Sequence, residues 1–479
     1  MSIPRLDRRR TFPLFMVLAA FVFALAAFRQ AVAPRALLIV APQALQPALA
    51  EYVAYKKTIL PVESATLESI LASIHGVDDP EKVKRYIYNA WRQRHVGYVL
   101  LVGDRDTMPL RYMTSLKFAT FDYLFQPTDL YYADLAKNDG SFNDWNADTS
   151  EYHAGYFGEV NGERGRPMNL DGIRYQPEVA VGRWPVSTPD AIAIVAAKSM
   201  AYERSVRDGR HPGLRTAAFF HVQGWVDARE QLTRLARTLP PGWSGHRFLF
   251  DDGNAAYRTA APTEAAVDGA FNQGAGLIVH VGHGETDSWI GYPLTYTVDG
   301  KKKVSEVLST RTLAPIHNAD RLPVVISVGC STAYFAPLGP GEAYIDTSGR
   351  AHAGEGHKEI VTGAPPPPSP YQPGKLGKDS LGKQLLEDGP NGAVAYIGSD
   401  MVAQPMALTL LDGFMNALRT SRDPRVGDNW TAAVRHYYEA AGLAHLEPDG
   451  DWVKPATFAQ AMKFNLFGDP SLPMAGPKQ

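Results

Sequence analysis

The sequence predicts an α/β fold with a mainly parallel sheet, helices on both faces of the sheet, and two lobes. Short, continuously apolar runs recur along the chain, as is typical of parallel strands that are buried on both faces. Stretches with helical spacing separate these runs, so strands and helices alternate. A hydrophobic content of 45% and a charged content of 20% in 479 residues fit a globular protein large enough for two lobes.

The N-terminal segment, residues 1–33, is predicted to be a signal peptide or signal anchor outside the fold. Three consecutive arginines precede an apolar run over residues 12–28, and Ala31-Val32-Ala33 is a small-residue cleavage site. Pro34 is a poor first residue for a mature chain, so an uncleaved membrane tether is the alternative. We therefore expect a secreted or cell-envelope protein.

Residues 34–206 are expected to form the N-terminal α/β lobe. Thr188 followed by Pro189 is typical of a helix start, and this helix is expected to continue to about Arg204. Apolar runs and helical spacing predict the other elements, which are strands at residues 36–40, 98–102 and 178–181 and helices over residues 45–59 and 79–94.

A polar stretch at residues 207–213 separates a second α/β lobe, residues 207–479. Within it, residues 363–374 include four consecutive prolines, which predict an exposed, extended loop outside the sheet. Apolar runs predict strands at residues 216–222, 246–250, 277–281, 323–328 and 393–397.

Cys330 is the only cysteine in the chain. An exported protein cannot use a single cysteine in an internal disulfide, so Cys330 is either a small buried side chain or a reactive thiol. Its position at the end of a predicted strand favours the second interpretation, because ligands of parallel α/β sheets meet the carboxyl ends of the strands.

His283 ends a second predicted strand in the same way. If the two strands are adjacent and parallel, His283 and Cys330 lie at the same rim, where the imidazole can take the proton from the thiol. Gly284 and Gly329 leave backbone N–H groups accessible to a substrate oxyanion. The pattern therefore predicts a Cys/His catalytic site.

Two other kinds of site fit less well. His280 and His283 would point to opposite faces of a strand, so they cannot bind one zinc ion without irregular backbone, and His280 is expected in the core. The sequence has no G-x-S-x-G segment of the kind that serine hydrolases use.

Several segments together resemble the gingipain-type cysteine peptidases, peptidase family C25, which have a caspase-like fold. His283 precedes Cys330 by 47 positions, close to the caspase spacing. The resemblance implies a caspase-like α/β/α sandwich and cysteine endopeptidase activity. The other matching segments, in chain order, are Tyr52-Val53-Ala54-Tyr55-Lys56, Leu101-Val102-Gly103-Asp104, Thr128-Asp129-Leu130-Tyr131-Tyr132, Glu178-Val179-Ala180-Val181-Gly182-Arg183 and Leu466-Phe467-Gly468-Asp469-Pro470-Ser471.

The resemblance also implies roles for individual residues. Cys330 matches the nucleophile that forms a thioester, and His283 matches the base. The N–H groups of Gly284 and Cys330 would hold the oxyanion. Glu178 takes the position of an acidic residue that orients the histidine and fixes its tautomer, while a charged residue opening a strand is the alternative.

Two residues are candidates for binding substrate. Asp190 lies where the resemblance places an acidic pocket residue for Arg or Lys, although a first-turn helix position explains it equally well. Trp289 follows His283 closely and is a candidate for contacting substrate, with core packing as the alternative. No tryptophan near residues 398–405 matches the aromatic wall of the family, so Arg or Lys specificity is not expected.

Asp144, Asn146 and Asp148 place side-chain oxygens at alternate positions, as at the start of a calcium loop, although the rest of an EF-hand is missing. A structural calcium ion and a plain polar turn both stay open, and catalysis itself is expected to need no cofactor.

The expected partner is a protein or peptide substrate. With 48 Lys and Arg against 50 Asp and Glu, no nucleic-acid partner is expected. Two alternatives are a surface transpeptidase that uses the same Cys/His pair and a catalytically silent surface-binding module.

Overall fold

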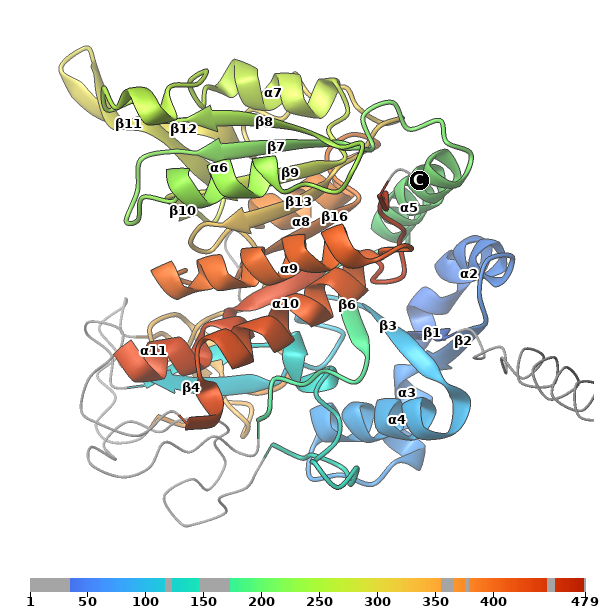
Figure 1. The fold of residues 1–479 in the computed structure, drawn as a ribbon. Coiled ribbons are helices and arrows are strands. Elements are labelled where there is room, and N and C mark those ends of the chain that lie inside the picture. The colour runs from blue at the N-terminus through green and yellow to red at the C-terminus, as the bar shows by residue number, and fades with distance from the viewer. Residues whose placement is uncertain are drawn as a thin grey trace, which may run out of the picture. The chain divides into compact units, whose positions relative to one another are not determined.

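The computed structural model describes residues 35–116, 123–145, 173–354, 365–374, 379–445 and 453–477. Ten strands form one sheet in the order β2-β1-β3-β6-β17-β16-β13-β9-β7-β8, with helices on both faces (Figure 1). These strands are β1 (Ala36–Ala41), β2 (Val62–Thr66), β3 (Val96–Val102), β6 (Ala180–Trp184), β7 (Thr216–His221), β8 (Ser244–Leu249), β9 (Leu277–Val281), β13 (Val324–Val328), β16 (Ala395–Ser399) and β17 (Phe464–Phe467).

The sheet consists of two parallel blocks that run in opposite directions. β2, β1, β3 and β6 are parallel to one another, and so are β16, β13, β9, β7 and β8. β17 lies between the blocks, antiparallel to β16 and parallel to β6, which it meets at the single pair Phe467↔Arg183. The first block comes from the predicted N-terminal lobe and the second from the predicted C-terminal lobe. The division of the chain into two lobes stays a prediction.

A buried ion pair stabilises the junction between the blocks. The Arg183 side chain is fully buried and donates two hydrogen bonds to the Asp129 carboxylate, at 2.8 and 2.7 Å. A third hydrogen bond, of 3.0 Å, reaches the carbonyl oxygen of Gly103. The backbone N–H of Asp129 donates to the side chain of Asn465 in β17, so the pair connects both blocks.

Alternation along the strands explains the three layers. In β1, Leu37 and Ile39 pack on one face, while Leu38 and Val40 pack on the other, and all four side chains are fully buried. Burying such a side chain contributes roughly 1.5–3 kcal/mol, so each face needs a helical cover. One face is covered by α2 (Ala50–Lys57), α5 (Pro189–Arg207), α7 (Glu264–Asn272) and α8 (Leu381–Glu387). The other is covered by α3 (Leu67–Ser73), α4 (Asp79–Arg94), α6 (Arg229–Arg237), α9 (Leu408–Thr420), α10 (Val426–Ala440) and α11 (Val453–Ala459).

The predicted strands are all present, and the helix that Thr188 and Pro189 predict begins as expected. The Thr188 side chain accepts a hydrogen bond from the N–H of Ala191, and Pro189 occupies the first turn. The helix predicted over residues 45–59 is divided instead into a 3₁₀ segment, Gln43–Leu49, and α2. Pro47 lies inside the 3₁₀ segment, and its missing N–H explains why no regular α-helix forms there.

The Pro-rich segment is more closely packed than predicted. Pro368 forms an antiparallel bridge with Asp346, and the side chain of Gln372 is fully buried. The Gln372 amide also accepts from and donates to the backbone of Ile345. Of the predicted loop, residues 365–374 are described; they belong to no strand of a sheet, but they are less exposed than predicted. A proline cannot donate to a ladder, but its carbonyl and its neighbours can still pair.

Smaller sheets lie outside the central one. β10 (Gly284–Glu285), β11 (Ser288–Val298) and β12 (Lys301–Ser309) form an antiparallel sheet, whose hairpin extends away from the central sheet in Figure 1. β4 (Tyr112–Leu116) pairs with β5 (Tyr123–Pro127), and β14 (Tyr344–Ile345) pairs with β15 (Ala351–His352).

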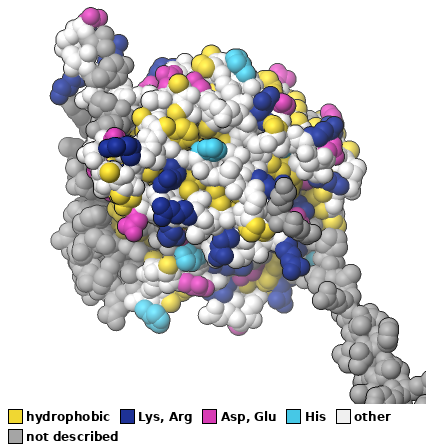
Figure 2. All heavy atoms as spheres, turned by 45° about the horizontal axis from the view of Figure 1, so that its top comes forward, with side chains coloured by type: hydrophobic (Ala, Val, Ile, Leu, Met, Phe, Trp, Pro, Cys, Tyr) yellow, Lys and Arg dark blue, Asp and Glu magenta, His cyan; other side chains and the backbone are white. Residues whose placement is uncertain are grey.

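Lys and Arg side chains are interspersed with acidic and hydrophobic ones on the face that Figure 2 shows. This distribution fits the near balance of 48 basic and 50 acidic side chains in the sequence. Among the helices of the described ranges, none combines the length and the apolar character needed to cross a membrane.

Candidate active site

His283 and Cys330 follow neighbouring parallel strands, as the sequence predicts. β9 and β13 pair in register, from Leu277↔Val324 to Val281↔Val328. His283 and Cys330 each lie two residues beyond the last pair, so both are at the same edge of the sheet. Both residues are partly exposed at this edge.

Gly284 brings the histidine segment directly against the cysteine. A Cβ atom added to Gly284 would lie 2.8 Å from the carbonyl oxygen and 3.1 Å from the nitrogen of Cys330. It would also lie 2.7 Å from Cγ2 of Thr332. Only a glycine permits this approach, so the two segments meet backbone to backbone.

The turns on both sides of the site have unusual backbone. Gly282, just before His283, has a φ of 151°, and an added Cβ would lie 2.1 Å from Cγ2 of Val222. Ser331, just after Cys330, has a φ of 56°, which costs a residue with a side chain on the order of 1–3 kcal/mol. The N–H of Ser331 donates to the carbonyl of Met401 at 2.8 Å, which helps to hold this turn.

The Cys330 thiol is partly buried. Its Sγ lies 3.9 Å from the carbonyl oxygen of Ala403. Burial raises the pKa of the thiol, while the backbone of Ala403 and the positive charge of Lys463 offset part of this rise and Glu285 adds to it. A thiol with a raised pKa needs a base or a cation to become a nucleophile near neutral pH.

A buried polar cluster lies in the core next to the active-site edge of β9 and β13. His280 is fully buried, its ring stacks on Trp289 at a centroid distance of 4.4 Å, and its Nδ1 lies 3.0 Å from Oγ of Ser327. Burial lowers the pKa of His280 to about 3, so this ring is neutral. As predicted, His280 is a core residue.

Trp289 belongs to the same cluster, and the prediction that it contacts substrate is wrong. It is fully buried, and its Nε1–H donates to the hydroxyl of Tyr396 at 3.1 Å. Proximity to His283 in the sequence suggested a substrate contact, but β11 turns this side chain into the core.

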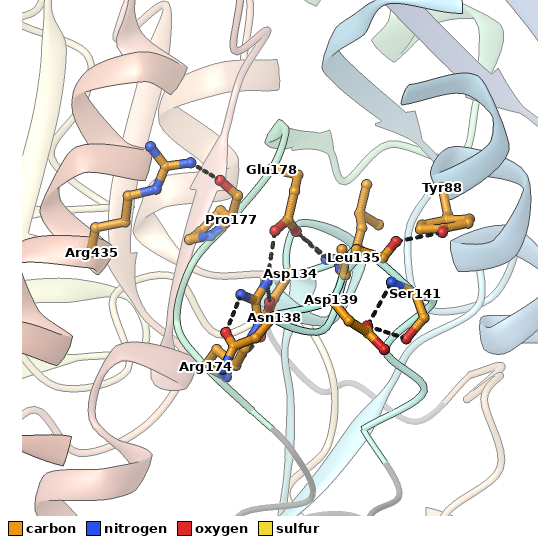
Figure 3. Close-up of polar contacts among 12 residues, drawn as sticks. Tyr88, Asp134, Leu135, Asn138, Asp139, Ser141, Arg174, Pro177, Glu178 and Arg435 are labelled. Carbon is orange, nitrogen blue, oxygen red and sulfur yellow. Dashed lines mark hydrogen bonds and ion pairs between the residues drawn. The ribbon is translucent and has the colours of Figure 1, made fainter. Parts of the chain in front are cut away.

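Glu178 lies in a network of its own, which Figure 3 shows. One carboxylate oxygen accepts from the N–H groups of Leu135 and Ala136, at 2.6 and 3.2 Å, and the other accepts from Arg174 at 2.7 Å. Burial and the charge of Asp134 raise the pKa of Glu178, and the backbone N–H of Leu135 counteracts the rise.

The sheet order also separates Glu178 from His283. Glu178 precedes β6, and β17, β16 and β13 lie between β6 and β9. At a strand spacing of about 4.8 Å this is a separation of roughly 19 Å. The structure therefore does not bring Glu178 to the imidazole, contrary to the role that the resemblance implied, and it gives the carboxylate the task of holding the loop at Leu135.

Asp190 lies at the opposite edge of the sheet from Cys330. β6 runs antiparallel to β13, so residues that follow β6 lie where β13 begins, whereas Cys330 follows the end of β13. Asp190 is exposed in the first turn of α5. The prediction of a pocket role for Asp190 is therefore wrong, and its place at a helix N-terminus explains it.

The predicted calcium segment is only partly described. Asp144 is within the described residues, whereas Asn146 and Asp148 lie outside them. Across the described part of the chain, no group of three or more His, Cys, Asp or Glu side chains is placed to hold a metal ion. Calcium binding stays a prediction.

Sequence reasoning missed two buried titratable residues around the loop that contacts the thiol, Asp400 and Lys463. Lys463 interrupts the apolar run Ala461-Met462-Lys463-Phe464, and a lone charge in such a run is a signal that could have found it.

The fold and the site define a class of protein. A three-layer α/β/α fold whose neighbouring parallel strands end at a histidine and a solitary cysteine is that of a caspase-like cysteine peptidase. The chain belongs to peptidase family C25, whose sequence profile matches residues 31–475. It is therefore a cysteine peptidase, a hydrolase that acts on protein or peptide substrates.

Solved structures agree with this fold. The crystal structure of the Arg-specific cysteine proteinase gingipain R superposes with a TM-score of 0.58 at 15% identity, covering 92% of this chain and 78% of the other. A complex of the pro- and mature domains of RgpB from Porphyromonas gingivalis gives 0.55 at 14% identity, with 91% and 79% covered. A further protease structure gives 0.58 at 13% identity, with 93% and 79% covered. No curated protein is significantly similar to the chain.

Proposed function

We propose that the chain is an exported endopeptidase that cleaves peptide bonds through a thioester on Cys330, with His283 as the base. The observation that carries this proposal is the contact of Gly284 with the backbone of Cys330. Together with the in-register pairing of β9 and β13, it keeps the imidazole and the thiol at one edge of the sheet.

The proposed reaction has two steps. His283 takes the proton of the Cys330 thiol, the thiolate attacks the peptide carbonyl carbon, and the C–N bond breaks as His283 protonates the leaving amine. Water then attacks the thioester while His283 accepts its proton, which releases the acid and restores the thiol. The N–H groups of Gly284 and Cys330 are the proposed oxyanion donors.

Because Glu178 binds Leu135 and Arg174 instead of the imidazole, we propose a Cys/His dyad without an orienting Glu178. Caspase-like chemistry needs the base beside the thiol, and a third group changes how well the base is oriented rather than which bonds are broken.

Export rests on the sequence of residues 1–33, whose arginines, apolar run and Ala31-Val32-Ala33 form a secretion signal. Mass spectrometry of the chain recovered from the cell envelope and from the medium tests this part. A chain that starts at Pro34 indicates cleavage, a chain that retains residues 1–33 in the envelope indicates a tether, and a full-length cytoplasmic chain contradicts export.

Cleavage of a mixed peptide library tests the enzymatic proposal. The wild type, Cys330→Ala and His283→Ala are compared, and the termini of the products are sequenced by mass spectrometry. We expect internal cleavage that Cys330→Ala abolishes and His283→Ala lowers by at least about a hundredfold. An added amine such as hydroxylamine or glycine amide distinguishes hydrolysis from transpeptidation, because transfer to the amine would identify the alternative enzyme.

A further inference from the structure

The residues that follow β16 form a short loop over the cysteine, residues 400–404, here called the 400-loop. Its Met401 carbonyl accepts from the N–H of Ser331, and its Ala403 carbonyl lies 3.9 Å from Sγ of Cys330. The preceding residue, Ser399, accepts from the N–H of Ala333 at 2.9 Å. The loop therefore touches the chain on both sides of the thiol and helps to define where the sulfur lies.

Lys463 holds the 400-loop from the other side. It directly precedes β17 and is only 2% exposed. Its Nζ donates to Oε1 of Gln404 at 3.0 Å and lies 3.4 Å from the carbonyl oxygen of Val402. Its own carbonyl accepts from the N–H of Asp400 at 2.8 Å. A buried ammonium with two acceptors in one loop links β17 to the cysteine turn.

Burial disfavours the charged forms of both Asp400 and Lys463. Asp400 is fully buried, and burial holds its pKa well above the usual range, although the charge of Lys463 and the side chain of Asn465 counteract part of the rise. Burial also lowers the pKa of Lys463, to about 8, and the charges of Asp400 and Cys330 counteract the drop. With a pKa of about 8, the Lys463 ammonium is mainly charged at pH 7.

We propose that Lys463 is a positioning residue of this peptidase, which fixes the 400-loop against Cys330 and supplies a positive charge that favours the thiolate. The inference rests on the proposed role of Cys330 as nucleophile. Titratable groups around the thiol and this loop also include His283, which takes the proton, Glu285, which is exposed and opposes the thiolate, and the buried Asp400, whose charge acts on Lys463.

The size of the electrostatic effect follows from the two contacts of the loop. Nζ is 3.4 Å from the Val402 oxygen, and Sγ is 3.9 Å from the Ala403 oxygen. Carbonyl oxygens of successive residues lie within roughly 5 Å of each other, so the ammonium and the sulfur are at most about 12 Å apart. At an effective dielectric constant of about 20, a unit charge at that distance changes a thiol pKa by about one unit, a tenfold change in thiolate below the pKa.

Alkylation by iodoacetamide measures this effect directly, because Cys330 is the only thiol in the chain. The rate is recorded from pH 5 to pH 10 for the wild type, Lys463→Met, Lys463→Arg and Gln404→Met. We expect the pH midpoint of the alkylation rate to rise by about one pH unit in Lys463→Met and to stay close to the wild-type value in Lys463→Arg. In Gln404→Met, which removes one acceptor of the ammonium, the midpoint should rise by less. The acid limb of kcat/KM should move with the midpoint while KM stays unchanged.

Lys198→Met is the matched control. Lys198 is also a buried lysine, but it donates to the carbonyls of Leu385, Leu386 and Asn391 near the end of α8. The Lys198→Met variant should have a lower midpoint of unfolding and an unchanged pH midpoint of Cys330 alkylation.

An unchanged pH midpoint of alkylation in both Lys463→Met and Gln404→Met would overturn the inference about Lys463 and leave Cys330 as the proposed nucleophile. Full peptidase activity in Cys330→Ala would instead overturn the proposed function. If Lys463→Met does not fold, Gln404→Met decides the question.

Discussion

Replacing Gly284 by alanine tests the contact on which the active site depends. The new methyl group would lie 2.7 Å from Cγ2 of Thr332 and 2.8 and 3.1 Å from the carbonyl oxygen and nitrogen of Cys330. Carbon atoms pack at roughly 3.5–4.0 Å, so the segments must separate by about 0.7 Å or more. Two of these neighbours are backbone atoms of Cys330, which cannot move aside as the end of a flexible side chain could.

Two magnitudes follow from this displacement. Overpacking of this kind costs about 1–3 kcal/mol of unfolding free energy. A shift of nearly 1 Å between base and nucleophile costs on the order of a hundredfold in rate. We therefore expect kcat/KM for a library-derived peptide to fall by about two orders of magnitude, with a modest loss of stability in urea unfolding.

Gly269→Ala is the matched control for Gly284→Ala. Gly269 lies inside α7, and an added Cβ would have Nε2 of Gln273 as its nearest neighbour, at 3.8 Å. Alanine in a helix interior gains roughly 0.5–1 kcal/mol over glycine, so this variant should be slightly more stable and fully active. Wild-type activity and stability in Gly284→Ala would instead show that the two segments are not in contact.

Three further predictions concern the surroundings of the site. Glu178→Gln should lower kcat/KM only a few-fold and leave the pH dependence of kcat/KM unchanged. A shift in either limb of that pH profile would indicate that the carboxylate does act on the imidazole. Arg183→Met leaves the Asp129 carboxylate buried without its partner and should cost roughly 3–5 kcal/mol in equilibrium unfolding, part of which Arg183→Met/Asp129→Leu should recover. Because the pKa of His280 falls to about 3 in the fold, its neutral form contributes stability above pH 6.5 that is lost as the pH falls toward 3. Between pH 7 and pH 5 this loss should be about 2 kcal/mol, and His280→Asn should reduce the slope.

Local patterns predicted much of the fold because local physics decides those features. The apolar run at residues 277–281 and the run at residues 323–328 are strands because each is buried on both faces. They end in register, so His283 and Cys330 lie at the same edge of the sheet, as expected. Thr188 caps α5 because a side-chain oxygen and a proline satisfy the first turn of a helix.

Long-range pairing decided the features that the sequence did not predict. The four residues of β17, Phe464–Phe467, join the sheet antiparallel to β16 and thereby reverse the direction of the first block. That reversal places Asp190 at the far edge, the strand order leaves Glu178 four strands from His283, and neither result is visible in local spacing. The predicted substrate contact of Trp289 was wrong for a related reason. Closeness to His283 in the sequence does not determine which face of β11 packs into the core.

Detection of the acyl-enzyme is the decisive test of Cys330 as the nucleophile. The wild type and His283→Ala are mixed with a peptide ester, quenched in acid within a second, and digested for mass spectrometry. We expect an acyl mass on the peptide that contains Cys330 in the wild type and a strong reduction of that mass in His283→Ala. Turnover of the ester with no acyl mass on Cys330, or with the mass on another residue, would show that Cys330 is not the nucleophile.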